Sequence, residues 1–535
     1  MLFNSYEFIL AFVPIVVAIY YAFGPQRRSA ALLWLVFTSL LFYAWWRPFN
    51  VVLIAPSIAI NYLLVTLLLR LDDRRPRLAT ALFWAGIAFN LAFLGYFKYR
   101  NFFFTAVNDV AGSSFSLDDL ILPLGISFIT FQKIALLVDV RAGRVAKVNL
   151  RDYALFVLFF PQLIAGPIVH YRELMPQFAA ADGQVRSEDF AVGLTLFFTG
   201  LFKKVMIADP IAALIAPSWA SVAAGGHPGL AQAWGAALGY MLQLYFDFSG
   251  YSDMAIGAAR LFGIKLPYNF DSPLKATSII DYWSRWHVTL TRFLTAYVFS
   301  PISLALTRKR AAKRLPGMAG RRTTLKAFLV LLAFPTMATM VLAGVWHGAG
   351  YQFLLFGALH GIALVINHGW RLRRPLWWPT GNRSATITTP GSWALTFMFV
   401  IAVEVFFRAS SVAAGIEILR GMAGGNGFTL PAAIAARLAP GLPVAAAFES
   451  GVEFVQLWGL IAIALFVVLA LPNSYEMLAD HAPALGFKTR PSGQTRLLER
   501  MTWAPSARWA IGLSGVTALG LLSLNRVSDF LYWHF

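Results

Sequence analysis

The chain has 535 residues, of which 58% are hydrophobic and only 13% are charged, and its mean hydropathy is +0.64. Soluble domains carry about a quarter charged residues, so this composition excludes a fold whose whole surface faces water and predicts a chain that crosses a lipid membrane many times. The net charge of +19 does not indicate nucleic-acid binding, because the lysines and arginines lie between apolar runs, where they set orientation and contact anionic lipid.

The apolar runs are spread over the whole length of the chain. A helix needs about 20 apolar residues to cross the hydrocarbon core, and the runs predict an all-α fold with about 11 to 13 membrane helices, some broken or re-entrant. We interpret residues 1–535 as a single membrane domain, since no repeat or separate soluble domain is evident. The candidate runs are 8–23, 30–46, 51–69, 78–97, 120–138, 153–169, 190–202, 230–246, 254–262, 327–345, 353–367, 392–407, 455–471 and 509–524.

Basic residues gather at four places, 27–28, 70–77, 141–151 and 308–326. Crossing outward and back returns the chain to the same side at the first three, and cytoplasmic loops carry the excess of lysine and arginine. We therefore expect these clusters in the cytoplasm and the amino terminus outside. Residues 1–6 place no basic side chain before the first apolar run, which is unlike a cleavable signal peptide.

Two aspartates, Asp247 and Asp253, interrupt an apolar region. Ionisable groups inside a bilayer are costly and mark functional candidates, so both are candidate substrate-binding side chains. Being six residues apart, they would face different sides of one helix, and Ser249-Gly250 between them is a candidate break. The alternative is a structural ion pair with an intramembrane cation such as Arg260.

A histidine follows in the segment Trp283-Ser-Arg-Trp-His287. His287 is a candidate catalytic residue that would orient an acyl donor or polarise its carbonyl, with Arg285 and Trp286 as candidate substrate contacts. Tryptophan favours headgroup depth and arginine extends toward it. The alternative is therefore an interfacial anchor with a hydrogen-bonded histidine.

The sharpest single position is His347, in Gly344-Val-Trp-His-Gly-Ala-Gly350. The glycines permit a broken helix and close approach of a substrate. A neutral imidazole is a natural general base for a hydroxyl that attacks a thioester, which makes His347 a candidate catalytic residue and Trp346 and Gly348 candidate substrate contacts. The alternative is a buried histidine that bonds a carbonyl and holds helices together.

The basic cluster at 308–326 precedes the run that leads to His347. It sets topology, and Arg308, Lys309 and Arg310 are also candidates for attracting the phosphates of a donor such as coenzyme A. We predict no metal site, because the histidines lack a zinc-site spacing and the chain has no cysteine. The lack of cysteine also excludes disulfides and a cysteine nucleophile.

These segments resemble the membrane-bound O-acyltransferase family, in particular its bacterial alginate O-acetyltransferase branch. Segments similar to that branch follow one another along nearly the whole chain. They are Met1–Phe8 (MLFNSYEF), 42–46 (FYAWW), 123–128 (PLGISF), 160–168 (FPQLIAGPI), 200–205 (GLFKKV), 245–253, 283–287, 345–348 (VWHG) and 407–410 (FRAS).

The resemblance implies a ring of helices around a thinned centre with a tunnel that joins the two faces. It implies that His347 is the catalytic histidine, that His287 is the second family histidine, and that residues 115–410 form the catalytic core. Residues 421–450 match nothing in the family and are interpreted as an insertion that faces a partner. The end of the chain, 529–535, resembles tails implicated in contacting partner transferases.

The resemblance further implies an enzyme of the bacterial inner membrane. Such an enzyme transfers acetyl from a cytoplasmic thioester, acetyl-CoA or another, to hydroxyls of an exported, alginate-like polysaccharide, without a tightly bound cofactor. A periplasmic acetyltransferase and the polysaccharide export machinery are the expected partners. Two alternatives stay open. A non-catalytic scaffold would keep polymer acetylation without His347, and a secondary transporter would show two matching halves, which the sequence lacks.

Overall fold

The computed structural model describes residues 1–45, 47–71, 75–115, 117–118, 120, 122–374, 382–428, 451–488, 501–524 and 531. Over these residues the chain is helical and forms no β-strand, apart from an isolated bridge between Pro267 and Leu485. The prediction of an all-α membrane protein is confirmed.

The α-helices of the first half are α1 (Val13–Ala22), α2 (Arg28–Ala44), α3 (Phe49–Leu71), α4 (Pro76–Leu94), α5 (Arg100–Ala111), α6 (Ile126–Arg141), α7 (Leu150–Leu158), α8 (Phe160–Leu163), α9 (Tyr171–Ala180), α10 (Ser187–Phe202), α11 (Asp209–Ala223) and α12 (Leu230–Arg260). Those of the second half are α13 (Ile279–Trp283), α14 (Val288–Leu294), α15 (Ser300–Ala312), α16 (Leu325–Phe328), α17 (Phe334–His347), α18 (Tyr351–Arg373), α19 (Asn382–Arg408), α20 (Val412–Met422), α22 (Gly451–Ala470), α23 (Ser474–Met477) and α25 (Ala507–Leu522).

Short segments of other helical pitch join or flank these helices. The π-helical ones are η1 (Glu7–Phe12), η3 (Gly95–Tyr99), η4 (Lys203–Ala208), η6 (Thr295–Phe299) and η8 (Leu329–Ala333). The 3₁₀ ones are η2 (Pro25–Arg27), η5 (Pro273–Lys275), η7 (Gly320–Arg322) and η9 (Ala479–His481). Wide π turns are frequent at functional sites, and here η3 contains Lys98 and η4 contains Lys203 and Lys204.

Eight helices of the described chain are long and apolar enough to cross a membrane, or nine if the pair 7–22 and 25–44, bent by 99°, counts as one span. The eight are Phe49–Leu71, Pro76–Ala111, Ser187–Ala223, Val288–Ala312, Leu325–His347, Tyr351–Arg373, Thr389–Arg408 and Gly451–Ala470. The sequence predicts about 11 to 13. The run 153–169 accounts for part of the difference, because it breaks at Phe159 into the short helices α7 and α8.

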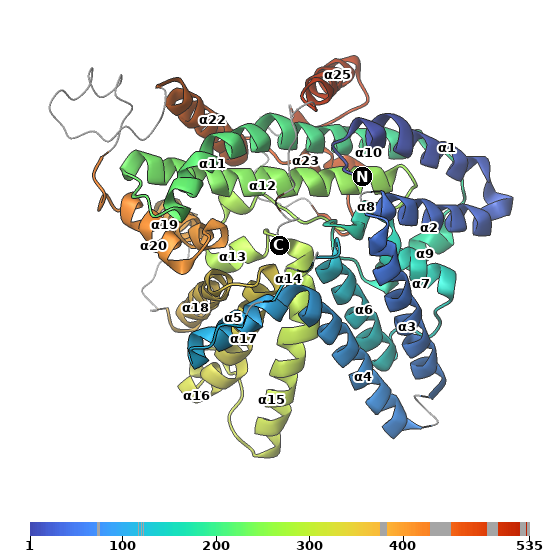
Figure 1. The fold of residues 1–535 in the computed structure, drawn as a ribbon, viewed down its shortest axis with the longest axis horizontal. Coiled ribbons are helices and arrows are strands. Elements are labelled where there is room, and N and C mark those ends of the chain that lie inside the picture. The colour runs from blue at the N-terminus through green and yellow to red at the C-terminus, as the bar shows by residue number, and fades with distance from the viewer. Residues whose placement is uncertain are drawn as a thin grey trace.

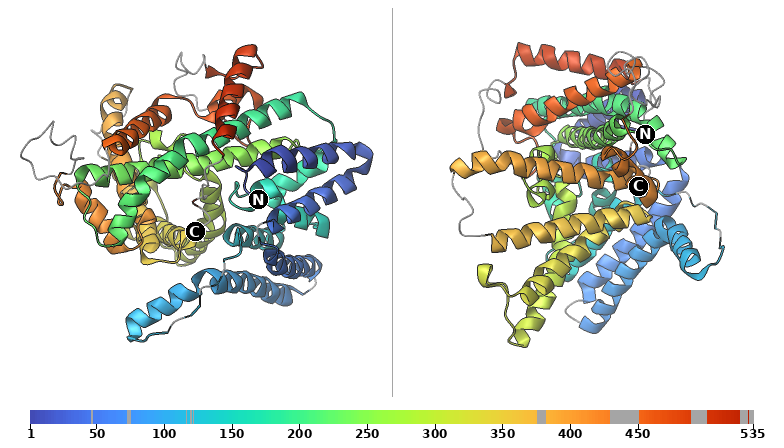
Figure 2. Two further views of the ribbon diagram at one scale, coloured as in Figure 1. Left: turned by 45° about the horizontal axis from the view of Figure 1, so that its top comes forward. Right: turned by 90° about the vertical axis from the view of Figure 1, so that its left-hand side faces the viewer.

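Helix α12 runs beside α10 and α11 on one side of the molecule, and α3, α4, α6 and α15 fan out on the other (Figure 1). Helices α13, α14, α17 and α18 lie between these two groups, and α18 packs against α19 (Figure 2). The candidate histidines belong to this middle layer. The family-implied ring and through-tunnel stay predictions.

Glycines bring α10 and α12 into backbone contact. A Cβ atom placed on Gly200 would lie 2.4 Å from the carbonyl oxygen of Gly250, and one on Gly257 would lie 2.5 Å from that of Gly193. Without a hydrophobic driving force between helices in lipid, such small-residue contacts are a main source of helix association. The contact between α10 and α12 places the lysines that follow α10 beside the aspartates of α12.

Candidate active site

His347 is the last residue of α17, and 3% of its surface is exposed. Its ring lies 4.8 Å from that of Trp346, 5.0 Å from that of Phe407 and 6.1 Å from that of Phe356, measured between centroids. Helices α17, α18 and α19 therefore enclose the imidazole in aromatic side chains. An apolar enclosure of this kind keeps bulk water away from a reacting group.

The crossing of α17 and α18 fixes this arrangement through glycine. A Cβ atom on Gly344 would lie 2.2 Å from the carbonyl oxygen of Phe353, and one on Gly357 would lie 2.3 Å from that of Met340. Gly348, which follows the histidine, has the Phe353 ring only 2.1 Å from where its Cβ would be. The glycines around His347 therefore allow close packing of the helices, and Gly348 contacts a protein ring.

A pocket of about 490 Å³, its open mouth included, borders His347 and Trp346. The segment 122–128, which leads into α6, also lines it, with Ile164 and Lys98 completing the lining. The cavity therefore reaches the residue predicted to be catalytic. His287 does not line this pocket.

Two side chains of the η3 turn bind the end of α17. The Lys98 ammonium donates hydrogen bonds to the carbonyl oxygens of Trp346 and His347, the latter at 3.4 Å, and to Ser127 Oγ at 3.4 Å. The Tyr99 hydroxyl donates to the carbonyl oxygen of Val345 at 2.9 Å. The last carbonyls of a helix have no partner within it, and η3 supplies partners here.

His287 lies just before α14 and is completely buried. Its backbone is left-handed, with φ 42° and ψ 54°, which is rare for a residue other than glycine and occurs most often at functional sites. Complete burial does not fit the alternative of an anchor at headgroup depth.

Asn269 holds His287 in place. Its side-chain oxygen accepts from Thr289 Oγ1 at 2.6 Å and lies 3.2 Å from His287 Nδ1, and its amide nitrogen donates to Ser252 Oγ at 3.1 Å. The oxygen is thus an acceptor, so Nδ1 is the nitrogen that carries the proton and Nε2 the one that carries the lone pair. A defined tautomer suits a residue that accepts a hydrogen bond or a proton.

Trp346 lies near both histidines. Its ring lies 4.8 Å from that of His347 and 6.3 Å from that of His287. The structure therefore brings the two residues predicted to be catalytic close to one indole ring. A catalytic role for either stays a prediction.

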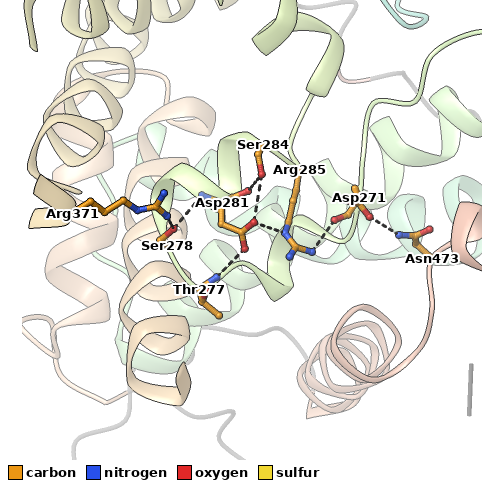
Figure 3. Close-up of polar contacts among 8 residues, drawn as sticks. All are labelled: Asp271, Thr277, Ser278, Asp281, Ser284, Arg285, Arg371 and Asn473. Atoms are coloured by element: carbon orange, nitrogen blue, oxygen red, sulfur yellow. Dashed lines mark hydrogen bonds and ion pairs between the residues drawn. The ribbon is translucent and has the colours of Figure 1, made fainter. Parts of the chain in front are cut away.

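The side chains of Trp286 and Arg285 both contact other residues of the protein. Trp286 is buried and stacks on Tyr282 at 5.7 Å. Arg285 Nε donates to Asp281 at 2.9 Å, and its Nη1 donates to the carbonyl oxygen of Asp271 at 3.3 Å (Figure 3). These contacts stabilise the loop before His287, and a contact of either residue with substrate stays a prediction.

Asp247 and Asp253 form ion pairs with two consecutive lysines of η4. Lys204 lies 2.7 Å from Asp247, and Lys203 lies 2.7 Å from Asp253. The predicted break at Ser249-Gly250 is wrong, because α12 is continuous from Leu230 to Arg260 and Gly250 serves close packing instead. The structural alternative is thus the one the contacts support.

Arg260 is not the partner of either aspartate, contrary to the expectation from sequence. It pairs with Asp189 of α10, whose carboxylate lies 2.6 Å from Arg260 Nε. The reason is its position as the last residue of α12, beside the start of α10 and beyond both Asp247 and Asp253 on the same helix.

Comparison with known proteins gives a consistent result. The model of the membrane-bound O-acyltransferase family matches residues 77–315, a range that includes His287 and ends before His347. The peptidoglycan O-acetyltransferase of Helicobacter pylori is 38% identical over 463 residues, which cover 80% of this chain and 81% of that protein. The chain belongs to the membrane-bound O-acyltransferase family.

Other relatives in the family act on different polymers, judging by their names. The probable alginate O-acetylase AlgI of Pseudomonas aeruginosa is 36% identical over 419 residues, covering 77% of this chain and 73% of its own. The teichoic acid D-alanyltransferase of Bacillus subtilis is 29% identical over 285 residues, covering 53% and 67%. The resemblance inferred from sequence is confirmed, and the protein is a multi-pass membrane O-acyltransferase that works in a lipid environment.

The predicted donor-phosphate residues differ from one another. Arg308 and Lys309 are exposed near the end of α15, whereas Arg310 is buried and donates from Nε and Nη2 to the carbonyl oxygen of Pro316. Arg310 therefore stabilises its own loop. The attraction of a phosphorylated donor by this cluster stays a prediction.

Some predictions fall on residues that are not described. Of the predicted insertion 421–450, residues 429–450 lie outside the described residues, and so do 529–530 and 532–535 of the predicted partner-contacting tail. The one described residue of that tail, Leu531, donates its backbone N–H to Asp247 at 3.2 Å.

Sequence reasoning missed Lys98, Asn269 and Glu404. Both Lys98 and Glu404 are ionisable. Lys98 directly follows an apolar run, and Glu404, which is 2% exposed, lies within the membrane span of α19. The rule that marks intramembrane charges as functional candidates would have found both. Asn269 carries no charge, and its role becomes visible only when His287 and Thr289 are seen to share its oxygen.

Proposed function

We propose that this O-acyltransferase moves an acetyl group from a cytoplasmic thioester, acetyl-CoA, to a hydroxyl presented from the outer face of the bacterial inner membrane. The observation that carries the proposal is that His347, a buried histidine at the end of a candidate membrane span, borders a pocket. An imidazole in such a place has the chemistry of a general base and is shielded from water that would hydrolyse the donor.

The reaction needs one proton acceptor and no redox partner. His347 accepts the proton of the attacking hydroxyl while the oxygen forms a bond to the thioester carbonyl carbon. The tetrahedral intermediate then collapses, the carbon–sulfur bond breaks, and the proton passes from His347 to the leaving thiolate. The products are an acetate ester and free coenzyme A, and His347 returns to its neutral form.

His287 would act on the donor in this scheme. His287 does not line the pocket, so we propose that it acts from behind the pocket wall, through the Trp346 ring that lies near both histidines. We further propose that the acceptor is a periplasmic partner transferase, which passes acetyl to peptidoglycan or to an alginate-like polymer. The names of the relatives support these two polymers equally.

Inverted inner-membrane vesicles from cells that produce the protein test the proposal. They expose the cytoplasmic face to added acetyl-CoA labelled in the acetyl group, and we would measure free coenzyme A and alkali-labile label on polymer. The chain has no cysteine of its own to react with a thiol reagent. His347→Ala should lower the rate by about 10²- to 10⁴-fold, the usual contribution of a general base.

His368→Ala is the matched control, because His368 lies in the same layer on α18 but does not line the pocket. It should keep wild-type activity. Label on polymer at wild-type rate with His347→Ala would reject the enzyme in favour of a scaffold. Uptake of label into vesicles without release of coenzyme A would indicate a transporter.

A further inference from the structure

Lys98 is an intramembrane cation that the proposed chemistry does not use. It lies in η3, within the membrane span Pro76–Ala111, far in sequence from α17. An unpaired cation at membrane depth costs several kcal/mol or more (about 2.5 to 3.5 on insertion scales). A lysine kept there therefore needs partners, and the partners it has point to its role.

The partners are the end of the helix that carries His347. Lys98 donates to the carbonyl oxygens of Trp346 and His347 and to Ser127 Oγ, and Tyr99 donates to that of Val345. The carboxyl end of a helix carries partial negative charge, so a cation is favoured there. Two neighbouring side chains of one π turn thus donate hydrogen bonds to three successive carbonyl oxygens, those of residues 345–347.

The ammonium also borders the pocket that His347 borders. It lies 5.9 Å from the centre of the Trp346 ring, the indole that lies near both histidines. A shift of Lys98 would therefore move Trp346 and His347 together, relative to the pocket wall.

We propose that Lys98 is the positioning residue for His347. Its ammonium binds the last carbonyls of α17, ends the helix at the histidine, and thereby fixes the imidazole against the pocket. This inference rests on the proposed function, because Lys98 can act on the reaction only if His347 is the catalytic residue. Misplacing a reacting group by about 1 Å can cost 10²-fold in rate.

Lys98→Met keeps the length of the side chain and removes the charge. We expect kcat for acetyl transfer to fall about 10²-fold with the KM for acetyl-CoA changed less than about twofold. Lys133→Met is the matched control, because Lys133 is also a buried lysine but donates its described hydrogen bond to Ser57 Oγ, at 2.7 Å, rather than to α17. Rates are compared per amount of folded, monodisperse protein.

Chemical restoration separates positioning from a merely structural role. Because the chain has no cysteine, Lys98→Cys introduces the sole thiol. Alkylation with 2-bromoethylamine rebuilds an ammonium of nearly lysine length and should restore kcat, as should Lys98→Arg in part. Alkylation with iodoacetamide adds a neutral group and should not, and the mass of the intact protein verifies each product.

Two results would overturn the inference: wild-type kcat in Lys98→Met, or equal restoration by the neutral and the charged adducts. The proposed function fails separately, if His347→Ala keeps full activity. If Lys98→Met keeps wild-type kcat while His347→Ala is inactive, the positioning role is rejected and the proposed function stands.

Discussion

His287 is held in a backbone conformation that costs about 1 to 3 kcal/mol for a residue other than glycine. Its neighbours maintain it, since the N–H of Val288 donates to the carbonyl oxygen of Asn269 at 2.9 Å while the Asn269 side chain bonds the His287 ring. The same asparagine thus fixes both the backbone and the ring. A residue held so firmly is suited to orienting a substrate.

Asn269→Ala should therefore lower activity more than stability alone explains. It leaves His287 Nδ1–H and Thr289 Oγ1 without their shared acceptor, at about 1 to 3 kcal/mol each. We expect kcat to fall about tenfold or more, because displacing a reacting group by about 1 Å is costly. We also expect a lower Tm. Acetyl transfer and thermal unfolding of the same samples measure both.

Asn90→Ala is the control for this prediction. Asn90 is equally buried and donates to Asn61 Oδ1 at 2.7 Å, away from the histidines. It should lower the Tm without lowering kcat per folded molecule. Equal losses of kcat in the two variants would contradict a specific role for Asn269.

At the residue scale, local sequence was informative where chemistry and spacing coincide. His347 and Trp346 stand out because glycines surround them in an apolar run, and the structure places them at a pocket. Lys98 contacts His347 across 249 positions of sequence. Such a contact is set by the packing of helices, which no local pattern encodes.

Helices α10 and α12 show how one pattern admits two interpretations. Gly250 follows a serine in a polar stretch, which suggests a broken helix, yet it lies where a Cβ would be 2.6 Å from the carbonyl oxygen of Gly200. A glycine needed for helix contact and a glycine that breaks a helix look alike in one sequence. Partner glycines seven positions apart on each helix, 193 and 200, 250 and 257, were the signal that distinguishes them.

Gly250→Ala should destabilise the fold by about 1 to 3 kcal/mol, the usual cost of overpacking. The added methyl meets the carbonyl oxygen of Gly200 first and then the start of η4. It therefore pushes the end of α10 and η4 away from α12 and stretches the Lys203–Asp253 and Lys204–Asp247 pairs. Thermal unfolding followed by the loss of monodisperse protein in detergent measures the effect. Gly459→Ala, on α22 with nothing within 4 Å, is the control, and an equal Tm in the two variants would contradict the packing argument.

At the scale of the whole molecule, the cytoplasmic position of the basic clusters stays a prediction from the sequence. Hydropathy, charge and family resemblance were sufficient for the fold class and the enzyme class, because lipid imposes helices on any spanning chain. They were insufficient for the number of spans, since runs such as 153–169 fold into short buried helices instead. The polymer that receives the acyl group leaves no signature in composition.

Orientation can be tested with single cysteines, because the chain has none. The two variants are Ser114→Cys and Ala311→Cys. Position 114 follows α5, position 311 lies in the basic region at the end of α15, and both are exposed. A membrane-impermeant maleimide on intact spheroplasts should label the first and reach the second only after permeabilisation. The reverse pattern would contradict a periplasmic amino terminus.

The tight crossing of α17 and α18 also limits how this enzyme could be redesigned. Backbone touches backbone at Gly344 and Gly357, so the wall of the pocket formed by the end of α17 cannot retreat to admit a bulkier acyl chain. The other main part of the lining, 122–128, belongs to a loop and the start of one helix. Libraries that seek acceptance of longer thioesters are best confined to that segment, with the histidine helix left untouched.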